Sequence, residues 1–196
     1  TDLGQVVNSI FQLKFVGTPW AAGTVFIDNI YFYKSPSGPS PLEGTWRMSP
    51  EAGALGVGPN QGAINWWSNS ADDVSIRSCF FDDTYVFSGG NFSNVLGSDT
   101  WLEPWQGFDP EACGAPMAPH DGSSPATYVY DESAGTLTVS GSGAYVGLSK
   151  AHNGGEDGLP ANNTITYLVD SLDANTMVLD IEAGSGVWWR FSLTKI

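Results

Sequence analysis

The segment Thr176–Ile196, TMVLDIEAGSGVWWRFSLTKI, indicates the fold class most clearly. It contains two strand-like runs, and Ala183–Val187 forms a short connection between them. Side chains on a strand alternate between two faces, so a register slip of one residue would mix apolar and charged side chains on both faces. We therefore expect an antiparallel hairpin in which Asp180 lies opposite Arg190. Its apolar face would carry Met177, Leu179, Ile181, Trp189, Phe191 and Leu193.

Other hairpins are expected earlier in the chain. Gly89-Gly90 is a two-residue turn that would set Phe87 opposite Phe92. Two further hairpins would join 127–130 to 136–139 and 163–170 to 176–182. No helical pattern is longer than one turn. Successive hairpins favour an all-β domain over residues 43–196, folded as an antiparallel up-and-down β-barrel or sandwich.

Composition and charge exclude several kinds of partner. The chain has 196 residues, of which 41% are hydrophobic, so it can bury a sizeable core. Its formal net charge of −14 repels phosphate backbones and anionic lipid, which argues against nucleic acid or membrane partners. No apolar run approaches the ~18 residues of a membrane span. Few charged residues and many small polar ones are typical of a secreted or cell-surface protein.

The first 34 residues read as a separate unit. The runs 10–16 and 24–34 are strand-like, and 35–42 (SPSGPSPL) reads as a linker. The run TVFIDNIYFYK resembles the closing strands of bacterial carbohydrate-binding modules, so 1–34 would be the tail of such a β-sandwich. The chain opens in β-like sequence with no signal peptide, and we expect a mature protein or a piece of a longer one.

Two features resemble the lipocalin-like (calycin) barrels. Gly44-Thr45-Trp46 would open the first strand, and Arg190 lies in the last. The resemblance implies a calycin-like barrel in which Trp46 packs against Arg190 and seals one end.

A second resemblance covers most of residues 43–196. Gly44-Thr45-Trp46-Arg47, Gly56-Val57-Gly58-Pro59, Trp66-Trp67-Ser68 and the run 81–87 (FDDTYVF) are similar to a module of surface and secreted proteins in marine polysaccharide-degrading bacteria. Those proteins accompany loci for β-glucans such as laminarin, beside family 16 glycoside hydrolases. The resemblance implies a glycan-related role and carries over no individual binding residue.

The two cysteines, Cys79 and Cys113, could pair in an oxidising compartment. The alternative is two buried free thiols.

Tryptophans are the main candidates for ligand contact. Exposed indole rings stack on sugars, and neighbouring carboxylates bind hydroxyl groups. Trp46 and Trp189 are expected in the core. For the other candidates a ligand platform and a core role stay open; these are Trp66, Trp67, Trp101, Trp105, Trp188 and, beside them, Glu103.

Carboxylates provide an enzymatic alternative. Asp180 and Glu182 share a strand face, and Glu103 lies between two tryptophans. A glycoside hydrolase needs two carboxyl groups, ~5–5.5 Å apart in retaining enzymes and ~6.5–9.5 Å apart in inverting ones. The E-x-D-x-x-E motif of family 16 hydrolases is absent from the sequence, and Arg190 is expected to neutralise Asp180.

Metal sites and histidine chemistry have weaker support. Asp72, Asp73, Asp82 and Asp83 could hold calcium, but their spacing matches no EF-hand and they suit a solvated surface equally well. His120 and His152 have no nucleophile elbow or zinc-binding partner motif. We expect no cofactor.

The leading hypothesis is a non-catalytic module that binds a neutral β-glucan-type polysaccharide or oligosaccharide. It would accompany other domains of a longer parent chain in polysaccharide degradation. An endo-acting β-glucanase and a structural spacer are the two alternatives.

Overall fold

The computed structural model describes residues 40–196. The chain divides between Ser40 and Pro41 into two units. The predictions for 1–34, and those for the linker up to residue 39, lie outside the described residues. Leu42, at the end of the expected linker, is fully buried, and its carbonyl oxygen accepts a hydrogen bond of 2.8 Å from Trp46 Nε1.

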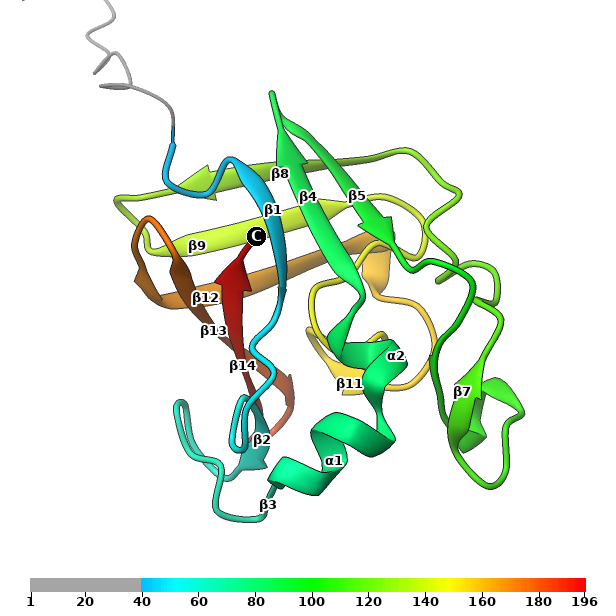
Figure 1. The fold of residues 1–196 in the computed structure, drawn as a ribbon. Helices are drawn as coiled ribbons and strands as arrows, with labels where there is room; N and C mark the ends of the chain where they lie inside the picture. Colours follow the sequence, from blue (N-terminus) through cyan, green and yellow to red (C-terminus); the bar gives the residue numbers. More distant parts are fainter. Residues whose placement is uncertain (1–39) are drawn as a thin grey trace, which may run out of the picture. The chain divides into compact units, whose positions relative to one another are not determined.

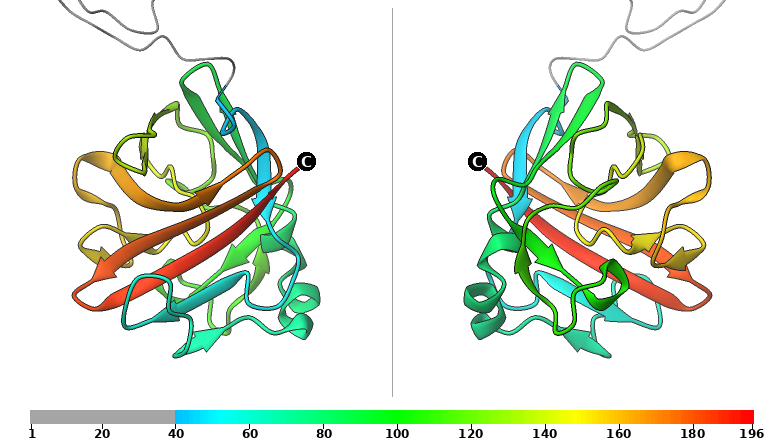
Figure 2. Two further views of the ribbon diagram at one scale, coloured as in Figure 1. Left: turned by 90° about the vertical axis from the view of Figure 1, so that its left-hand side faces the viewer. Right: turned by 90° about the vertical axis from the view of Figure 1, so that its right-hand side faces the viewer.

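Within residues 40–196, eight antiparallel strands close into a barrel (Figure 1). Each strand pairs with the next along the ring, and the last pairs with the first, so the prediction of an all-β up-and-down barrel is confirmed. In Figure 2, β12, β13 and β14 lie side by side in one wall. The eight strands are β1 (Gly44–Met48), β4 (Thr84–Ser88), β5 (Asn91–Val95), β8 (Ala126–Asp131), β9 (Thr136–Ser140), β12 (Thr164–Leu172), β13 (Thr176–Gly184) and β14 (Val187–Lys195).

Shorter elements are attached to this barrel. The strands β2 (Leu55–Gly58) and β3 (Trp67–Ser68) extend the sheet beyond β14. Two separate ladders join β6 (Thr100–Leu102) to β7 (Ala112–Gly114) and β10 (Ala151–His152) to β11 (Gly155–Glu156). The remaining elements are helices α1 (Ala71–Ile76) and α2 (Ser78–Phe81) and 3-10 turns at Pro104–Gln106 and Ala161–Asn163.

The expectation of no helix longer than one turn is wrong, because α1 spans six residues. Ser70 Oγ accepts from the backbone N–H of Asp73 at 3.2 Å, and the Asp73 carboxylate accepts from the backbone N–H of Ser70 at 2.7 Å. This capping box starts the helix although no residue of α1 is buried. Within residues 40–196 no helix is long and apolar enough to cross a membrane.

The hairpins follow the predicted registers. In the last one, Asp180 lies opposite Arg190 and Leu179 opposite Phe191. Phe87 lies opposite Phe92 across Gly89-Gly90, whose φ angles of 55° and 84° are both in the left-handed region. Such a turn matches the right-handed twist of its flanking strands. The hairpins β8–β9 and β12–β13 also form where they were expected.

A loop fills one end of the barrel interior. Residues 143–148 are all buried. Tyr167 Oη accepts a hydrogen bond from the backbone N–H of Val146 at 2.8 Å, and Tyr85 Oη donates to the Gly147 carbonyl at 3.2 Å. A Cβ atom on Gly147 would lie 2.4 Å from the Phe191 ring, so only glycine allows this approach. The backbone of the loop therefore occupies space that a ligand would need inside the barrel.

The predicted contact between Trp46 and Arg190 is wrong. Trp46 is fully buried as expected, but it pairs with Lys195, whose Nζ lies 5.1 Å from the Trp46 ring centroid. Arg190 lies five residues earlier on β14 and on the outer face, where it binds Asp180. Strand alternation places odd-numbered residues of β14 inside the barrel, so Lys195 and not Arg190 can cover Trp46.

Candidate functional site

Arg77 brings two of the predicted tryptophans together. Its guanidinium carbon lies 5.4 Å from the ring centroid of Trp67 and 4.6 Å from that of Trp101, within the range of cation–π contacts. Arg77 stands at the junction of α1 and α2, Trp67 is in β3, and Trp101 is in β6. Its Nη2 also donates to Glu111 Oε1 at 2.9 Å. Three separate segments thus meet at one charged side chain.

The tryptophans of this cluster differ in exposure. The side chains of Trp66 and Trp67 are 56% and 38% exposed, whereas Trp101 is half-buried and packs against the core. Arg77 lies against one face of the Trp67 ring and holds it in place. Trp67 keeps more than a third of its surface exposed beside this contact.

Glu103 lies at the centre of a second cluster. Its carboxylate accepts from Lys150 Nζ at 2.8 Å on one oxygen and from Trp105 Nε1 at 3.2 Å on the other. Lys150 Nζ is also 5.2 Å from the Trp189 ring centroid, and Trp189 Nε1 donates to Glu156 at 2.7 Å. Glu103 is buried, and its two oxygens are engaged in orienting neighbouring side chains.

A pocket lies beside Trp105. It encloses about 220 Å³, and its walls combine rings, aliphatic groups and one amide: Trp105, Gln106, Met117, Ala118, Pro119, His120, Gly158 and Leu159. The His120 ring packs edge-on against Trp105 at 5.5 Å between centroids and against Tyr145 at 5.9 Å. Burial lowers the pKa of His120, although Asp121 opposes this shift, so its imidazole is neutral at pH 7.

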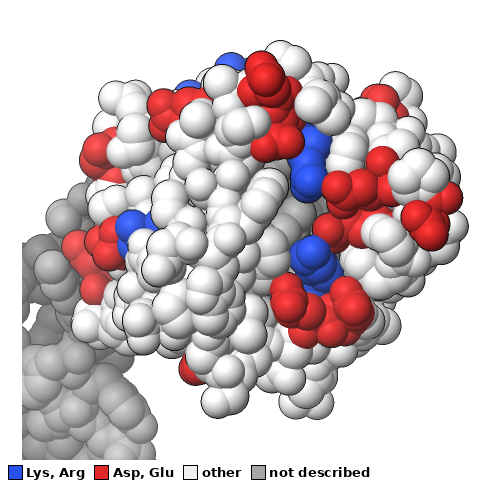
Figure 3. All heavy atoms as spheres, turned by 90° about the horizontal axis from the view of Figure 1, so that it is seen from below, with Lys and Arg blue, Asp and Glu red and all other residues white. Residues whose placement is uncertain are grey.

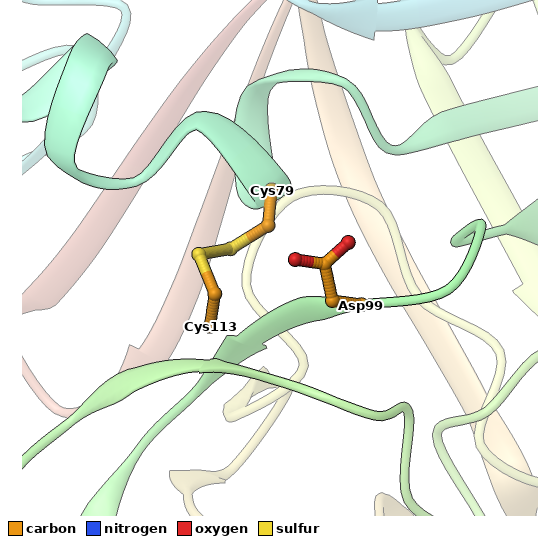
Figure 4. Close-up of side chains that lie close together, drawn as sticks. All are labelled: Cys79, Asp99 and Cys113. Carbon is orange, nitrogen blue, oxygen red and sulfur yellow. A yellow bond between two sulfur atoms is a disulfide. The ribbon is translucent and has the colours of Figure 1, made fainter.

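Cys79 and Cys113 form a disulfide between α2 and β7. Figure 4 shows the carboxylate of Asp99 beside the two sulfur atoms, and these three residues form the only group of three metal-ligand side chains within residues 40–196. Both sulfurs are consumed by the disulfide and offer no thiolate, so this group does not fit a metal ion.

The four aspartates considered for calcium do not form a site. Asp73 is bound in the capping box of α1, while Asp72 and Asp82 are exposed. Asp83 is buried and accepts a 2.6 Å hydrogen bond from Thr100 Oγ1. Burial raises the pKa of Asp83 to about 8, and the charges of Asp82 and Asp99 add to the shift, so the carboxyl is largely protonated at neutral pH. A protonated carboxyl is a poor calcium ligand.

The three alternative catalytic carboxylates each have their own hydrogen-bond partners. Asp180 is fully buried and binds Arg190 through two hydrogen bonds of 2.8 Å. Glu182 is exposed on the outer face of β13 and accepts from the backbone N–H of Gly186. Glu103, by contrast, contacts Lys150, which lies against the inward-facing Trp189. Glu103 and Glu182 therefore have separate hydrogen-bond partners, and the carboxylate pair stays a prediction.

Trp188 also lies away from these clusters. It is half-buried on the outer face of β14, opposite Glu182 on one side and Gly58 on the other. Of the six predicted ligand residues, the Arg77 contacts unite Trp67 and Trp101, and a hydrogen bond unites Glu103 and Trp105.

Charges on this side of the molecule are paired. Figure 3 shows basic side chains bordered by acidic ones beside a hollow in the surface. Arg77 forms an ion pair with Glu111 at 2.9 Å, and Lys150 forms one with Glu103 at 2.8 Å. These cations are already neutralised by the protein, so they are poorly suited to capture a polyanion.

Comparison with known proteins gives only distant structural similarities. No protein-family model and no curated protein sequence matches the chain. A lipocalin-like protein from Bacteroides uniformis is 13% identical and matches over 80% of this chain and 100% of its own, with a TM-score of 0.39. An uncharacterized protein from Bacteroides eggerthii is 10% identical over 79% and 99% of the two chains, with a TM-score of 0.37. Because both scores are low, we base the fold class on the strand pairing alone.

Sequence reasoning missed the residues that connect the aromatic side chains. Arg77 and Lys150 lie 24 and 47 positions from Trp101 and Glu103, so no local pattern links them. His120 was considered only as a catalytic or zinc-binding residue, and its place in a pocket wall depends on the fold of the 115–120 segment. The scarcity of basic residues was the one feature of the sequence that could have pointed to Arg77 and Lys150. Each of the few cations in such an acidic chain is expected to have a specific partner.

Proposed function

We propose that this chain is a secreted or cell-surface module that binds a neutral β-glucan-type polysaccharide without cleaving it. It would act as an accessory to polysaccharide degradation, alongside other domains of a longer parent chain. Trp67 carries this proposal, because its indole is 38% exposed and supported by Arg77 at 5.4 Å.

A supported indole suits the binding of a sugar ring. The C–H groups on a sugar face are apolar and pack flat on an aromatic ring, while the hydroxyl groups stay in water. A ring that is already held in place loses little conformational entropy on binding. The adjacent Trp66, 56% exposed, enlarges the apolar area at this site.

Charge favours a neutral polymer. The net charge of −14 disfavours anionic polysaccharides, and the ion pairs of Arg77 and Lys150 leave these cations without spare charge. An acidic polymer would also have to approach exposed carboxylates such as Asp72 and Glu111.

The filled barrel supports a surface site. The loop around Gly147 occupies one end of the interior, against Tyr85, Tyr167 and Phe191. A ligand carried inside the barrel would have to displace this buried loop, whereas a polymer can lie on Trp66 and Trp67 without rearrangement.

The Cys79–Cys113 disulfide supports an extracellular location, since disulfides persist mainly in oxidising compartments. The carboxylate nearest to Trp105 supports binding over hydrolysis, since both oxygens of Glu103 are already engaged by Lys150 and Trp105.

Affinity electrophoresis tests the proposal. The native protein is run through gels that contain laminarin, lichenan or xylan, and a reducing-sugar assay is run in parallel. We expect retardation by the β-glucans with no sugar release, and loss of this retardation in Trp66→Ala/Trp67→Ala. Val129→Ala is the matched control, because Val129 is 66% exposed on β8 and should not affect binding. Sugar release, or equal retardation of the double variant and the native chain, would contradict the proposal.

A further inference from the structure

We infer that the pocket lined by Trp105 and His120 is a second subsite, which takes a single neutral sugar ring and binds its hydroxyl groups through His120. This inference rests on the proposed function and adds to it a site for short oligosaccharides or chain ends, separate from the polymer platform of Trp66 and Trp67.

His120 is a buried polar side chain whose hydrogen-bonding capacity is unused. It is only 5% exposed, lines the pocket, and makes no side-chain hydrogen bond to any residue in 40–196. Neither ring nitrogen is a fully buried atom without a partner, so both are open to water in the pocket and can exchange that water for a ligand hydroxyl group. The other histidine differs, because His152 already has backbone carbonyl oxygens at 3.3 and 3.0 Å from its two ring nitrogens.

The chemistry of His120 matches a hydroxyl group. A neutral imidazole offers one N–H donor and one nitrogen acceptor, and a hydroxyl group can likewise donate and accept. The flanking rings of Trp105 and Tyr145 fix the orientation of this imidazole. An anion would find no cation lining the pocket, and a cation would find no carboxylate.

Trp105 provides the apolar surface. Its Nε1 donates to Glu103 at 3.2 Å, and Lys150 holds the same carboxylate from the other side, so the indole is fixed in orientation. Met117 and Leu159 are 40% and 49% exposed at the pocket and add apolar contact area. Gln106 also lines the pocket; its Oε1 accepts from the backbone N–H of Glu103 at 3.2 Å, which leaves its amide NH2 group for a second hydroxyl group.

The size of the pocket limits the ligand. The pocket has a volume of about 220 Å³. It is smaller than the ~300–1,000 Å³ typical of drug-sized ligands. One sugar ring fits such a space, and the other rings of an oligosaccharide would extend through the open side of the pocket.

Histidine nitrogen NMR tests the inference directly. The chain has two histidines, so ¹⁵N-histidine labelling yields two pairs of imidazole nitrogen signals, and His152 serves as the internal reference. The probes are laminaritriose and cellotriose, titrated to millimolar concentration. We expect one of them to shift the ring nitrogens of His120 saturably while those of His152 stay in place.

Variants separate this inference from the proposed function. Calorimetry with the same trisaccharides should show a loss of about tenfold or more in affinity for His120→Phe and for Trp105→Ala, which is about 1.4 kcal/mol. Both variants should still be retarded by β-glucan gels, and Trp66→Ala/Trp67→Ala should show the reverse pattern. His120→Gln, which keeps a donor and an acceptor, should retain more affinity than His120→Phe; circular dichroism confirms that each variant is folded.

Contrary results are distinguishable. If the polymer retards the native chain but neither trisaccharide shifts the His120 signals, the pocket inference is wrong and the proposed function stands. If trisaccharides bind equally to the native chain, His120→Phe and Trp105→Ala, the subsite lies elsewhere. If neither polymer nor trisaccharide binds, both proposals fail.

Discussion

Trp101 and Cys113 lie directly opposite each other on the β6–β7 hairpin. The disulfide therefore joins β7 of this hairpin, through Cys113, to α2, through Cys79. Cys79 lies two residues after Arg77. This covalent link holds the guanidinium of Arg77 at 4.6 Å from the Trp101 ring, and through Arg77 it supports Trp67. The stability of the proposed binding surface thus depends on a bond between two residues that touch no ligand.

Removal of the disulfide should destabilise the domain. The cysteines are 34 residues apart, and the chain-entropy model gives about 3–4 kcal/mol for a closed loop of this length. We expect Cys79→Ala/Cys113→Ala to lower the free energy of unfolding by about that amount in urea denaturation. The native chain treated with a dithiol reductant should match the variant, and an unchanged midpoint in both would contradict this role.

Trp101 and Trp66 should differ in their effect on the free energy of unfolding. Trp101 packs against the core, so Trp101→Ala should cost about 3 kcal/mol in free energy of unfolding. Trp66 is 56% exposed, and Trp66→Ala should change stability by less than about 0.5 kcal/mol. Urea denaturation monitored by circular dichroism compares them; equal losses would show that the two indoles have the same structural role.

Asp83 should make stability fall as pH rises. Burial raises its pKa in the folded chain to about 8, whereas the unfolded side chain titrates near its ordinary value of 3.8. Between these values the folded chain holds a proton that the unfolded chain has lost. The contribution of protonated Asp83 to the free energy of unfolding is therefore complete below about pH 4. It decreases by about 1.4 kcal/mol per pH unit up to about pH 8.

Asp83→Asn isolates this effect. The asparagine is uncharged and nearly isosteric, so the variant should lack the decline, and the difference in free energy of unfolding between variant and native chain should grow from pH 4 to pH 8. The carboxylates of Asp73 and Asp173, whose pKa values are lowered by hydrogen bonds, act in the opposite direction in both proteins and cancel in the difference. A constant difference across this range would show that Asp83 is ionised in the folded state.

Arg190 should matter mainly as the partner of a buried charge. Asp180 is fully buried, and its two oxygens each accept a 2.8 Å hydrogen bond from Arg190. Arg190→Leu leaves that charge without its partner and should cost about 3–5 kcal/mol. The double variant Asp180→Leu/Arg190→Leu removes both charges and should recover most of this loss in urea denaturation. A double variant no more stable than Arg190→Leu would contradict this explanation.

Part of the barrel was predictable from short-range pattern. Alternation along Thr176–Ile196 predicted the pairing of Asp180 with Arg190, and the Gly89-Gly90 turn predicted that of Phe87 with Phe92; the structure confirms both. The capping box of α1 is also a local pattern, because Ser70 and Asp73 are three residues apart. The helix was still not predicted, since α1 has no buried residue and therefore no apolar stripe that would mark it in the sequence. The contact of Trp46 was assigned to Arg190 by family resemblance, although strand alternation favours Lys195.

The amino-acid sequence by itself determined the main hairpins, their pairing registers and their inward faces, because alternation and tight turns act over a few residues. Tertiary structure alone decided which aromatic rings remain accessible and what holds them. The contacts of Arg77 with Trp67 and Trp101, of Lys150 with Glu103, and of His120 with Trp105 join loops from distant parts of the chain. Only closure of the barrel and of the Cys79–Cys113 bond brings these loops together, so their energies are not encoded in any local pattern.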